Sequence, residues 1–442
     1  MPNTFDLLIT NATVVNHDGE GVRDIGIRGG RIVGLGQLAA SAKAERVIDA
    51  SGLHILPGVI DTQVHFREPG LTHKEDLETG SRAAVLGGVT AVFEMPNTKP
   101  LTTSAECLAE KVALARNRMF CDFAFYVGGT RENVADIPAL ERLEGSAGIK
   151  VFMGSSTGDL LVDDEISLDH IIAALSRRAA FHAEDEARLN ARKGLREPGN
   201  PASHPVWRDA TAALEATTRL VRIAETHRRR VHVLHISTGD EMAFLAQHKD
   251  WASVEVTPHH LTLTDAATMT FDTSTRVAPP LRSARHVEAL RRGLAEGVID
   301  AIATDHAPHA TYEKEVEFTE APPGMIGLET ALAVCLQLVR EGVLSPLELV
   351  RRLSTNPARV LGLEGGSLAV GAEADIVLVD PERIWTYDPG RGHSKSRNSP
   401  WADQRLTGRV VATFVAGRIA YGFEHKDEHK DEHKDERGVP NR

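Results

Sequence analysis

The side chains best suited to metal binding and proton transfer follow short apolar runs along this chain. In order they are His65 and Arg67, Asn97, Lys150, His182, His235, His259 and His260, and finally Asp305, His306 and His309. Imidazole and carboxylate are the usual ligands of a catalytic zinc ion, which keeps one position for water. Several polar groups buried at the same end of apolar runs are costly unless they share a purpose. The pattern therefore predicts a catalytic metal centre.

Lys150 lies inside an apolar run, Gly148-Ile149-Lys150-Val151-Phe152-Met153. An unpaired buried ammonium is expensive, so the lysine could pair with a buried acid or extend its amine to solvent. A third interpretation is carbamylation by carbon dioxide. That modification removes the positive charge and creates an anionic group able to bridge two metal ions. The neighbouring candidates His182, His235 and Asp305 favour the third interpretation.

Alternating strands and helices must position these residues. Strand-like apolar runs are expected at residues 55–64, 88–94, 121–127, 148–153, 178–182, 230–236, 253–257 and 298–304. Helical stretches rich in Ala, Leu, Glu and Arg lie between them, for example at 74–86, 103–117, 211–228 and 283–294. Eight such repeats predict a (β/α)₈ barrel of the TIM type, an α/β fold with its active site at the carboxyl ends of the strands. A doubly wound open sheet is the alternative, which the periodicity alone does not exclude.

Both ends of the chain are rich in β-forming residues and contain no helix of useful length. Strand-like segments occur at residues 5–15, 26–35 and 46–55, and again at 374–380 and 408–421. We therefore predict a small β-sandwich domain built from residues 1–56 plus 366–423, around a catalytic barrel at 57–365. The tail at 424–442 contains HKDE three times and should be disordered or a loose charged helix.

The composition is that of a globular protein, with 442 residues, 42% hydrophobic and 25% charged. The formal charge of −12 argues against a nucleic-acid or membrane-surface partner. No run approaches the roughly 20 apolar residues of a membrane span, and the N-terminus lacks the pattern of a signal peptide. We therefore expect a cytoplasmic protein without a membrane partner. Cys107, Cys121 and Cys335 are widely spaced, which predicts buried free thiols.

Seven motifs together resemble the dihydroorotases of the amidohydrolase superfamily. They are LPGVIDTQVHFREPG, EMPNT, GIKVFMGSSTG, FHAED, VLHIS, ATDHAPH and GLET. With NPARVLGL and GSLAVGAEADIVLVDP, the resemblance extends from residue 5 to about residue 421. It implies an enzyme with one or two zinc ions per chain, bridged by carbamylated Lys150. His65 and Asp305 would bind the first ion, and His182 and His235 the second.

The resemblance also implies roles in the reaction. Asp305 would act as the general base, while Arg67, Asn97 and His309 would bind the carboxylate of a small-molecule substrate. Guanidinium suits that task because it grips carboxylate bidentately. The implied reaction interconverts dihydroorotate and N-carbamoyl-L-aspartate in the de novo biosynthesis of pyrimidines (UMP). A homo-oligomer, and association with aspartate transcarbamoylase, are the implied assemblies.

The sequence departs from the family pattern in three places that bear on the site, one of which is Pro322-Pro323-Gly324, where the usual aromatic residue before glycine is missing. Gln63 stands where the family places a histidine ligand, and an amide oxygen is a weak zinc ligand. Ala278 stands where the family usually places a carboxamide. One alternative function is a hydantoinase- or allantoinase-type cyclic amidase. Hydantoinases and dihydropyrimidinases resemble one another in a tyrosine shortly after the bridging lysine, and residues 151–158 contain none. A second alternative function is that of a non-catalytic partner of aspartate transcarbamoylase. Such a partner is expected to have lost several of the metal ligands.

Overall fold

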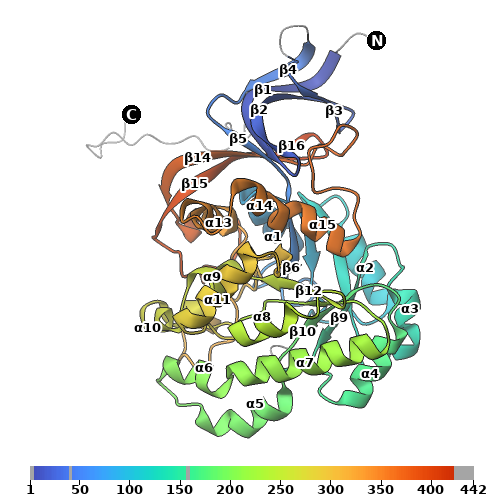
Figure 1. Cartoon of the computed structure of the whole chain (residues 1–442), viewed down its shortest axis with the longest axis vertical. Helices are drawn as coiled ribbons and strands as arrows, with labels where there is room; N and C mark the ends of the chain where they lie inside the picture. The colour runs from blue at the N-terminus through green and yellow to red at the C-terminus, as the bar shows by residue number, and fades with distance from the viewer. Residues whose placement is uncertain (1–3, 39–41, 156–159, 423–442) are drawn as a thin grey trace, which may run out of the picture.

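The computed structural model describes residues 4–38, 42–155 and 160–422, which form a helix-covered barrel and a smaller β domain (Figure 1). Our prediction for the charged tail at 424–442 lies outside the described residues. The first and last parts of the chain meet in the β domain, where strands from both termini lie side by side. No helix in these ranges is both long and apolar enough to cross a membrane.

Eight parallel strands form the barrel, in an order that follows the chain from β6 to β13. They are β6 Val59–Val64, β7 Val89–Glu94, β8 Asp122–Gly128, β9 Ser146–Phe152, β10 Ala179–His182, β11 Val231–Val233, β12 Ala252–Val256 and β13 Ala301–Ile302. The barrel is nearly closed beyond the last strand, where the His65 backbone N–H donates to the His306 carbonyl oxygen at 2.8 Å. The predicted (β/α)₈ barrel is confirmed. The open-sheet alternative is wrong, because the strand order never reverses.

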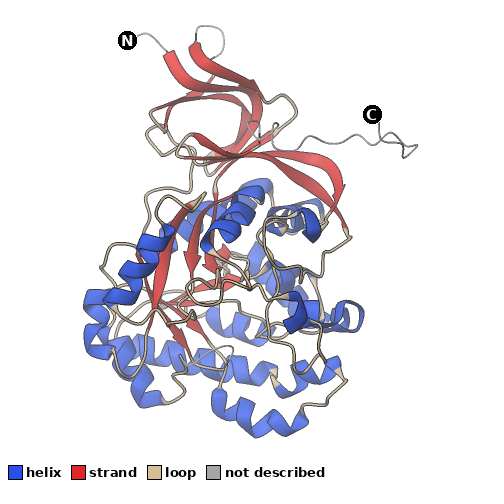
Figure 2. Ribbon diagram, turned by 180° about the vertical axis from the view of Figure 1, so that it is seen from behind, coloured by secondary structure: helices blue, strands red, loops and turns tan. Residues whose placement is uncertain are grey.

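Helices surround the barrel strands, as the view from behind shows (Figure 2). They are α1 Leu77–Leu86, α2 Ala105–Ala115, α3 Ile137–Leu140, α4 Glu165–Ala174, α5 Glu186–Arg192, α6 His204–Trp207, α7 Ala210–Thr226, α8 Gly239–Leu245, α9 Pro258–Thr262, α10 Thr268–Phe271, α11 Ala284–Ala295, α12 Thr311–Lys314, α13 Ala331–Arg340, α14 Pro346–Val350 and α15 Asn356–Leu361. Side-chain caps begin several of them: Asp76 before α1, Asp209 before α7 and Thr238 before α8 each accept a backbone N–H of the first turn.

The terminal domain is a mixed sheet of eight strands around its own apolar core. Its strands are β1 Thr4–Asn16, β2 Gly19–Arg28, β3 Arg31–Gly36, β4 Lys43–Asp49, β5 His54–Pro57, β14 Ile376–Thr386, β15 Arg405–Val415 and β16 Arg418–Tyr421. β5 joins the two ends of the chain, because it pairs in parallel with β1 and antiparallel with β14. β5 ends at Pro57 and β6 begins at Val59. We retain a domain boundary at residue 57 as a proposal.

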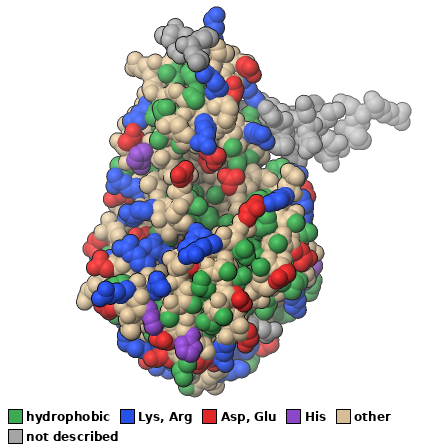
Figure 3. Space-filling view, turned by 90° about the vertical axis from the view of Figure 1, so that its right-hand side faces the viewer, with side chains coloured by type: hydrophobic (Ala, Val, Ile, Leu, Met, Phe, Trp, Pro, Cys, Tyr) green, Lys and Arg blue, Asp and Glu red, His purple; other side chains and the backbone are tan. Residues whose placement is uncertain are grey.

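Charges of both signs are spread over the surface of the barrel and of the terminal domain, on the face that Figure 3 shows. All three cysteines are free thiols. Cys121 and Cys335 are buried as predicted, whereas Cys107 on α2 is only half-buried.

Candidate active site

The carboxyl ends of the barrel strands surround a small cavity that contains most of the predicted site residues. Its lining consists of Gln63, His65, Arg67, Phe152, His182, His235, Ala278, Asp305, Ala307, Pro323 and Gly324. Parallel strands all end at the same rim, so residues more than 200 positions apart in the sequence share one cavity. Ala278, one of the departures from the family pattern, leaves only a methyl group in this lining.

Three residues of the lining have backbone conformations that L-residues rarely adopt. Arg67 has a φ of 65°, His235 of 33° and Asp305 of 50°. Each directly follows the end of a strand or lies within a few residues of it. Such conformations destabilise the fold by about 1–3 kcal/mol each and cluster at functional sites, where the surrounding structure holds them in place. The strained backbone turns these side chains toward the cavity.

His182 and His235 form one half of the site. His182 Nδ1 lies 3.0 Å from His235 Nε2, and the two rings meet edge to face. The other nitrogen of His182, Nε2, lies 3.0 Å from Glu184 Oε2. A carboxylate can only accept, so Nε2 donates and the Nδ1 lone pair faces His235. Burial lowers the pKa of both histidines, which keeps them in the neutral form that binds metal.

Glu184 is a functional residue that the sequence reasoning did not select. Its carboxylate is fully buried and forms an ion pair with Arg208 as well as the bond to His182. Burial opposes ionisation of Glu184, but Arg208 and His182 together hold its pKa well below the usual range. A carboxylate behind a ligating histidine sets the tautomer and the orientation of the ring. The signal was present in the motif FHAED, two residues after His182.

Lys150 lies on β9 beneath the cavity and does not contribute to its lining. It is 1% exposed, and its Nζ has no hydrogen-bond partner among the described residues. Burial lowers the pKa of Lys150 to about 7, although the nearby carboxylates of Asp305 and Glu255 favour its charged form. These observations disfavour both the ion-pair and the solvent-reaching interpretations. The amine lies over the Phe152 ring, 4.3 Å from its centroid. A buried amine without a hydrogen-bond partner and with a lowered pKa suits carbamylation.

The other half of the site consists of Gln63, His65 and Asp305. His65 Nε2 lies 3.2 Å from Asp305 Oδ1, and Gln63 Nε2 lies 2.8 Å from the same oxygen. His65 Nδ1 lies 2.7 Å from Asn97 Oδ1, so Asn97 orients the imidazole and does not line the cavity. The Gln63 amide therefore faces the Asp305 carboxylate with its nitrogen.

The two halves differ in how well they suit a metal ion. Two imidazole nitrogens that share one zinc ion lie on the order of 3 Å apart, and His182 and His235 have this separation. With the Lys150 amine between the halves, the His182–His235 pair fits a metal ion. At the other half the Gln63 amide nitrogen cannot bind a cation, so His65 and Asp305 have lost one partner ligand.

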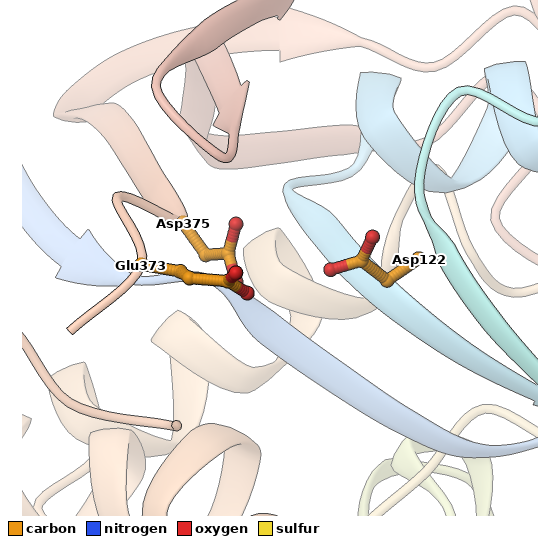
Figure 4. A group of neighbouring side chains, drawn as sticks. All are labelled: Asp122, Glu373 and Asp375. Carbon is orange, nitrogen blue, oxygen red and sulfur yellow. The ribbon is translucent and has the colours of Figure 1, made fainter. Parts of the chain in front are cut away.

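A separate group of carboxylates, Asp122, Glu373 and Asp375, lies away from the cavity lining (Figure 4). In the described ranges, this is the one group of at least three His, Cys, Asp or Glu residues that has all its possible ligand atoms within 4.8 Å of one another. Asp122 begins β8, whereas the cavity lies where the strands end. Glu373 and Asp375 belong to the segment that enters the terminal domain. The group contains no histidine, and none of its members is fully buried.

Arg67 and His309 lie side by side at the rim. Arg67 is 4% exposed, donates through Nε to the Pro308 carbonyl oxygen at 3.1 Å, and places Nη2 3.4 Å from His309 Nε2. Burial lowers the pKa of Arg67 to about 10, so the guanidinium stays charged at neutral pH. It forms no ion pair with a carboxylate among the described residues. His309 does not line the cavity, and it contacts the Pro323 carbonyl oxygen and the Lys74 amine.

The remaining histidines of the predicted set contact protein groups outside the cavity lining, although Nε2 of His259 and of His306 has no hydrogen-bond partner among the described residues. His260 contacts the Thr257 hydroxyl and the Pro279 carbonyl oxygen. His259 packs against the His260 ring, and His306 accepts the Gly327 backbone N–H. None of the three lines the cavity. Their spacing after apolar runs matches that of the site residues, so the residue pattern alone did not separate them, whereas the family resemblance gave these three histidines no role.

Comparison with known proteins relates the chain to cyclic amidohydrolases in sequence and in structure. A family model described as "Amidohydrolase family" matches residues 54–420. A protein named "Dihydroorotase" from Anaeromyxobacter dehalogenans is 39% identical over 438 residues, covering 94% of this chain and 98% of its own. Another of that name from Pelotomaculum thermopropionicum is 40% identical over 435 residues, covering 93% and 98%. Among solved structures, an L-hydantoinase (dihydropyrimidinase) from Arthrobacter aurescens superposes with a TM-score of 0.91 at 29% identity, covering 95% and 96%.

Proposed function

Because the chain belongs to the amidohydrolase family, we propose that it is a dihydroorotase that interconverts dihydroorotate and N-carbamoyl-L-aspartate. Relatives that carry this name cover nearly the whole chain at 36–40% identity. The reaction belongs to the de novo synthesis of pyrimidines, and we place it in the cytoplasm. Self-association, and association with aspartate transcarbamoylase, belong to the same proposal.

The buried guanidinium of Arg67 is the observation that carries the choice of substrate. It lines the cavity and is charged. Glu94, Asp305, Glu313 and Glu75 favour its charge from a distance, but within the described part of the chain no carboxylate forms a close ion pair with it. A buried charge without a partner is unfavourable unless a ligand supplies the opposite charge. A substrate carboxylate would supply that charge through a bidentate pair. Hydantoins and dihydrouracil have no such group, which distinguishes this site from that of a hydantoinase.

The residues present fit a zinc ion at His182 and His235, with carbamylated Lys150 as the third ligand. When bound, zinc would polarise the scissile carbonyl group and lower the pKa of a water molecule. Glu184 holds the His182 ring so that Nδ1 faces the centre. Lys150 reacts with carbon dioxide only as the neutral amine, and its burial increases the share of that form at neutral pH.

Asp305 and Arg67 perform the remaining steps. Arg67 binds the substrate carboxylate and so orients the ring amide toward Asp305, which lines the same cavity. The Asp305 carboxylate accepts a proton from the attacking water as the new carbon–oxygen bond forms. It returns that proton to the ring nitrogen as the carbon–nitrogen bond breaks, so no net proton is consumed in this exchange. Gln63 holds Asp305 in position by donating its amide N–H to Oδ1, and His65 lies beside the same oxygen.

Replacement of Arg67 tests the proposal. We expect Arg67→Ala to reduce kcat/KM for dihydroorotate about 10–100-fold, because charge-assisted hydrogen bonds contribute about 1.5–3 kcal/mol. Hydrolysis of dihydrouracil, which lacks the carboxylate, should change little. Arg116→Ala is the matched control, because Arg116 is exposed on the outside of the barrel and pairs only with Glu144. Equal losses for both substrates would favour a hydantoinase-like enzyme, and zinc-loaded protein without turnover would refute the enzymatic function.

A further inference from the structure

We infer that this enzyme holds one tightly bound metal ion, at the His182–His235 position, and that Gln63 replaces the other ion as the group that holds Asp305. The inference rests on the proposed metal-dependent function and concerns how many ions it uses. Its basis is the orientation of one side chain. Gln63 is 2% exposed and lies on β6, at the point where this strand enters the cavity.

The amide of Gln63 can face Asp305 in only one way. Its Nε2 lies 2.8 Å from Asp305 Oδ1, and a carboxylate oxygen requires a donor at that distance. The amide oxygen Oε1 therefore points elsewhere, and it is buried without a hydrogen-bond partner among the described residues. Turning Oε1 toward a cation beside Asp305 would remove the N–H donor from the carboxylate. In this orientation Gln63 donates a hydrogen bond to Asp305 and offers no ligand atom beside that carboxylate oxygen.

The two positions consequently differ in ligand supply. At the His182–His235 position two neutral imidazoles face each other at 3.0 Å, Glu184 locks one ring, and the Lys150 amine is available for the third ligand. At the other position only His65 and Asp305 remain beside Lys150, and the Asp305 oxygen nearest His65 already accepts the Gln63 N–H. With Lys150 counted, each position has three candidate protein ligands, the number that zinc sites generally use besides water. At the first position, however, Asp305 would share its oxygen with the Gln63 N–H. The first position has the weaker ligand set.

Gln63 supplies part of what an ion at that position would provide. A cation would neutralise the Asp305 carboxylate and fix its direction. The Gln63 amide donates to Oδ1 and fixes the same direction with a hydrogen bond. His65 donates through Nδ1 to Asn97, so its Nε2 lies beside Oδ1 at 3.2 Å without donating to it. Asp305 therefore keeps the orientation needed for proton transfer without an ion beside it.

The test counts zinc in the full-length enzyme after removal of metal with a chelator and titration with zinc chloride in bicarbonate buffer. Calorimetry and elemental analysis of the dialysed protein should give one tight equivalent per chain. His235→Ala should lose that equivalent, whereas His65→Ala should keep it. Gln63→His, which restores an imidazole, should bind a second equivalent.

Each other outcome overturns the inference. Two tight equivalents in the unaltered enzyme, or one that His65→Ala removes and His235→Ala retains, would place metal at the first position. A Gln63→His variant that binds a single equivalent would show that Gln63 does not limit occupancy. The His65→Ala and His235→Ala pair keeps the test decisive even if Gln63→His fails to fold. Absence of tight zinc from the unaltered enzyme would refute the metal-dependent function itself.

Discussion

The unpartnered amine of Lys150 should make the stability of the metal-free protein depend on pH. Burial lowers its pKa from 10.5 to about 7 in the folded chain. Between these two values the unfolded chain binds a proton at this lysine that the folded chain lacks, so the free energy of unfolding rises with pH. Below pH 7 both states are protonated and the full destabilisation remains.

The size of the effect follows from the two pKa values. The destabilisation due to Lys150 is about 4 kcal/mol at pH 7 and about 2 kcal/mol at pH 9, at 1.36 kcal/mol per pKa unit. In the Lys150→Met variant, the side chain at position 150 cannot be ionised. The stability of the unaltered protein should therefore increase by about 2 kcal/mol relative to that of Lys150→Met between pH 7 and pH 9.

Urea unfolding at several pH values measures this difference. The protein must be free of metal and kept in buffer without carbon dioxide, so that Lys150 stays unmodified. The variant Lys43→Met is the matched control, because Lys43 is exposed on β4 and should change nothing. Parallel pH profiles for the unaltered protein and Lys150→Met would refute the reasoning. They would mean that the amine is charged in the folded state and has found a partner.

Two further predictions concern buried ion pairs around the site. Glu184→Gln should lower zinc affinity about 10–100-fold, because the carboxylate behind His182 no longer fixes its ring. Competition with a chromophoric chelator measures the affinity, and Glu144→Gln, at an exposed position, is the control. Unchanged affinity would contradict the prediction. Lys111→Met should lower the free energy of unfolding by about 3–5 kcal/mol, because it leaves the fully buried Glu94 without its ion-pair partner. Urea unfolding measures this loss of stability. The double variant Lys111→Met/Glu94→Leu should recover much of the lost stability. A loss below about 1 kcal/mol would show that the ion pair is not essential.

The alternation of strands and helices could be predicted because it depends on local composition. The predicted strand ranges differ most from the structure where the site begins. The runs at 230–236 and 298–304 contain only the short strands Val231–Val233 and Ala301–Ile302. Close beyond each strand lie His235 and Asp305, whose positive φ values are incompatible with a continuing strand. Closure of the barrel was not predictable from periodicity, because it depends on a contact between His65 and His306.

The candidate site could be predicted as a set of residues but not as an arrangement. Histidines after apolar runs were recognised, yet Gln63 facing Asp305 and Glu184 behind His182 depend on side chains from distant strands. Asn97 illustrates the same point. The resemblance assigned it to the substrate carboxylate, whereas in the structure it contacts His65. Hydrogen-bond direction requires coordinates because several partners compete for each polar atom.

The pairing of β5 with β14 has a consequence for how this protein is made. β5 ends at Pro57 and its partner strand begins at Ile376, so more than 300 residues separate them. A chain emerging from the ribosome cannot complete the terminal sheet until the barrel sequence has been synthesised. His65 and Asp305 likewise lie just after the first and just after the last barrel strand. A polypeptide interrupted before residue 305 would therefore contain His182 and His235 without the acid that completes the site, and would leave the edge of β5 exposed to other chains.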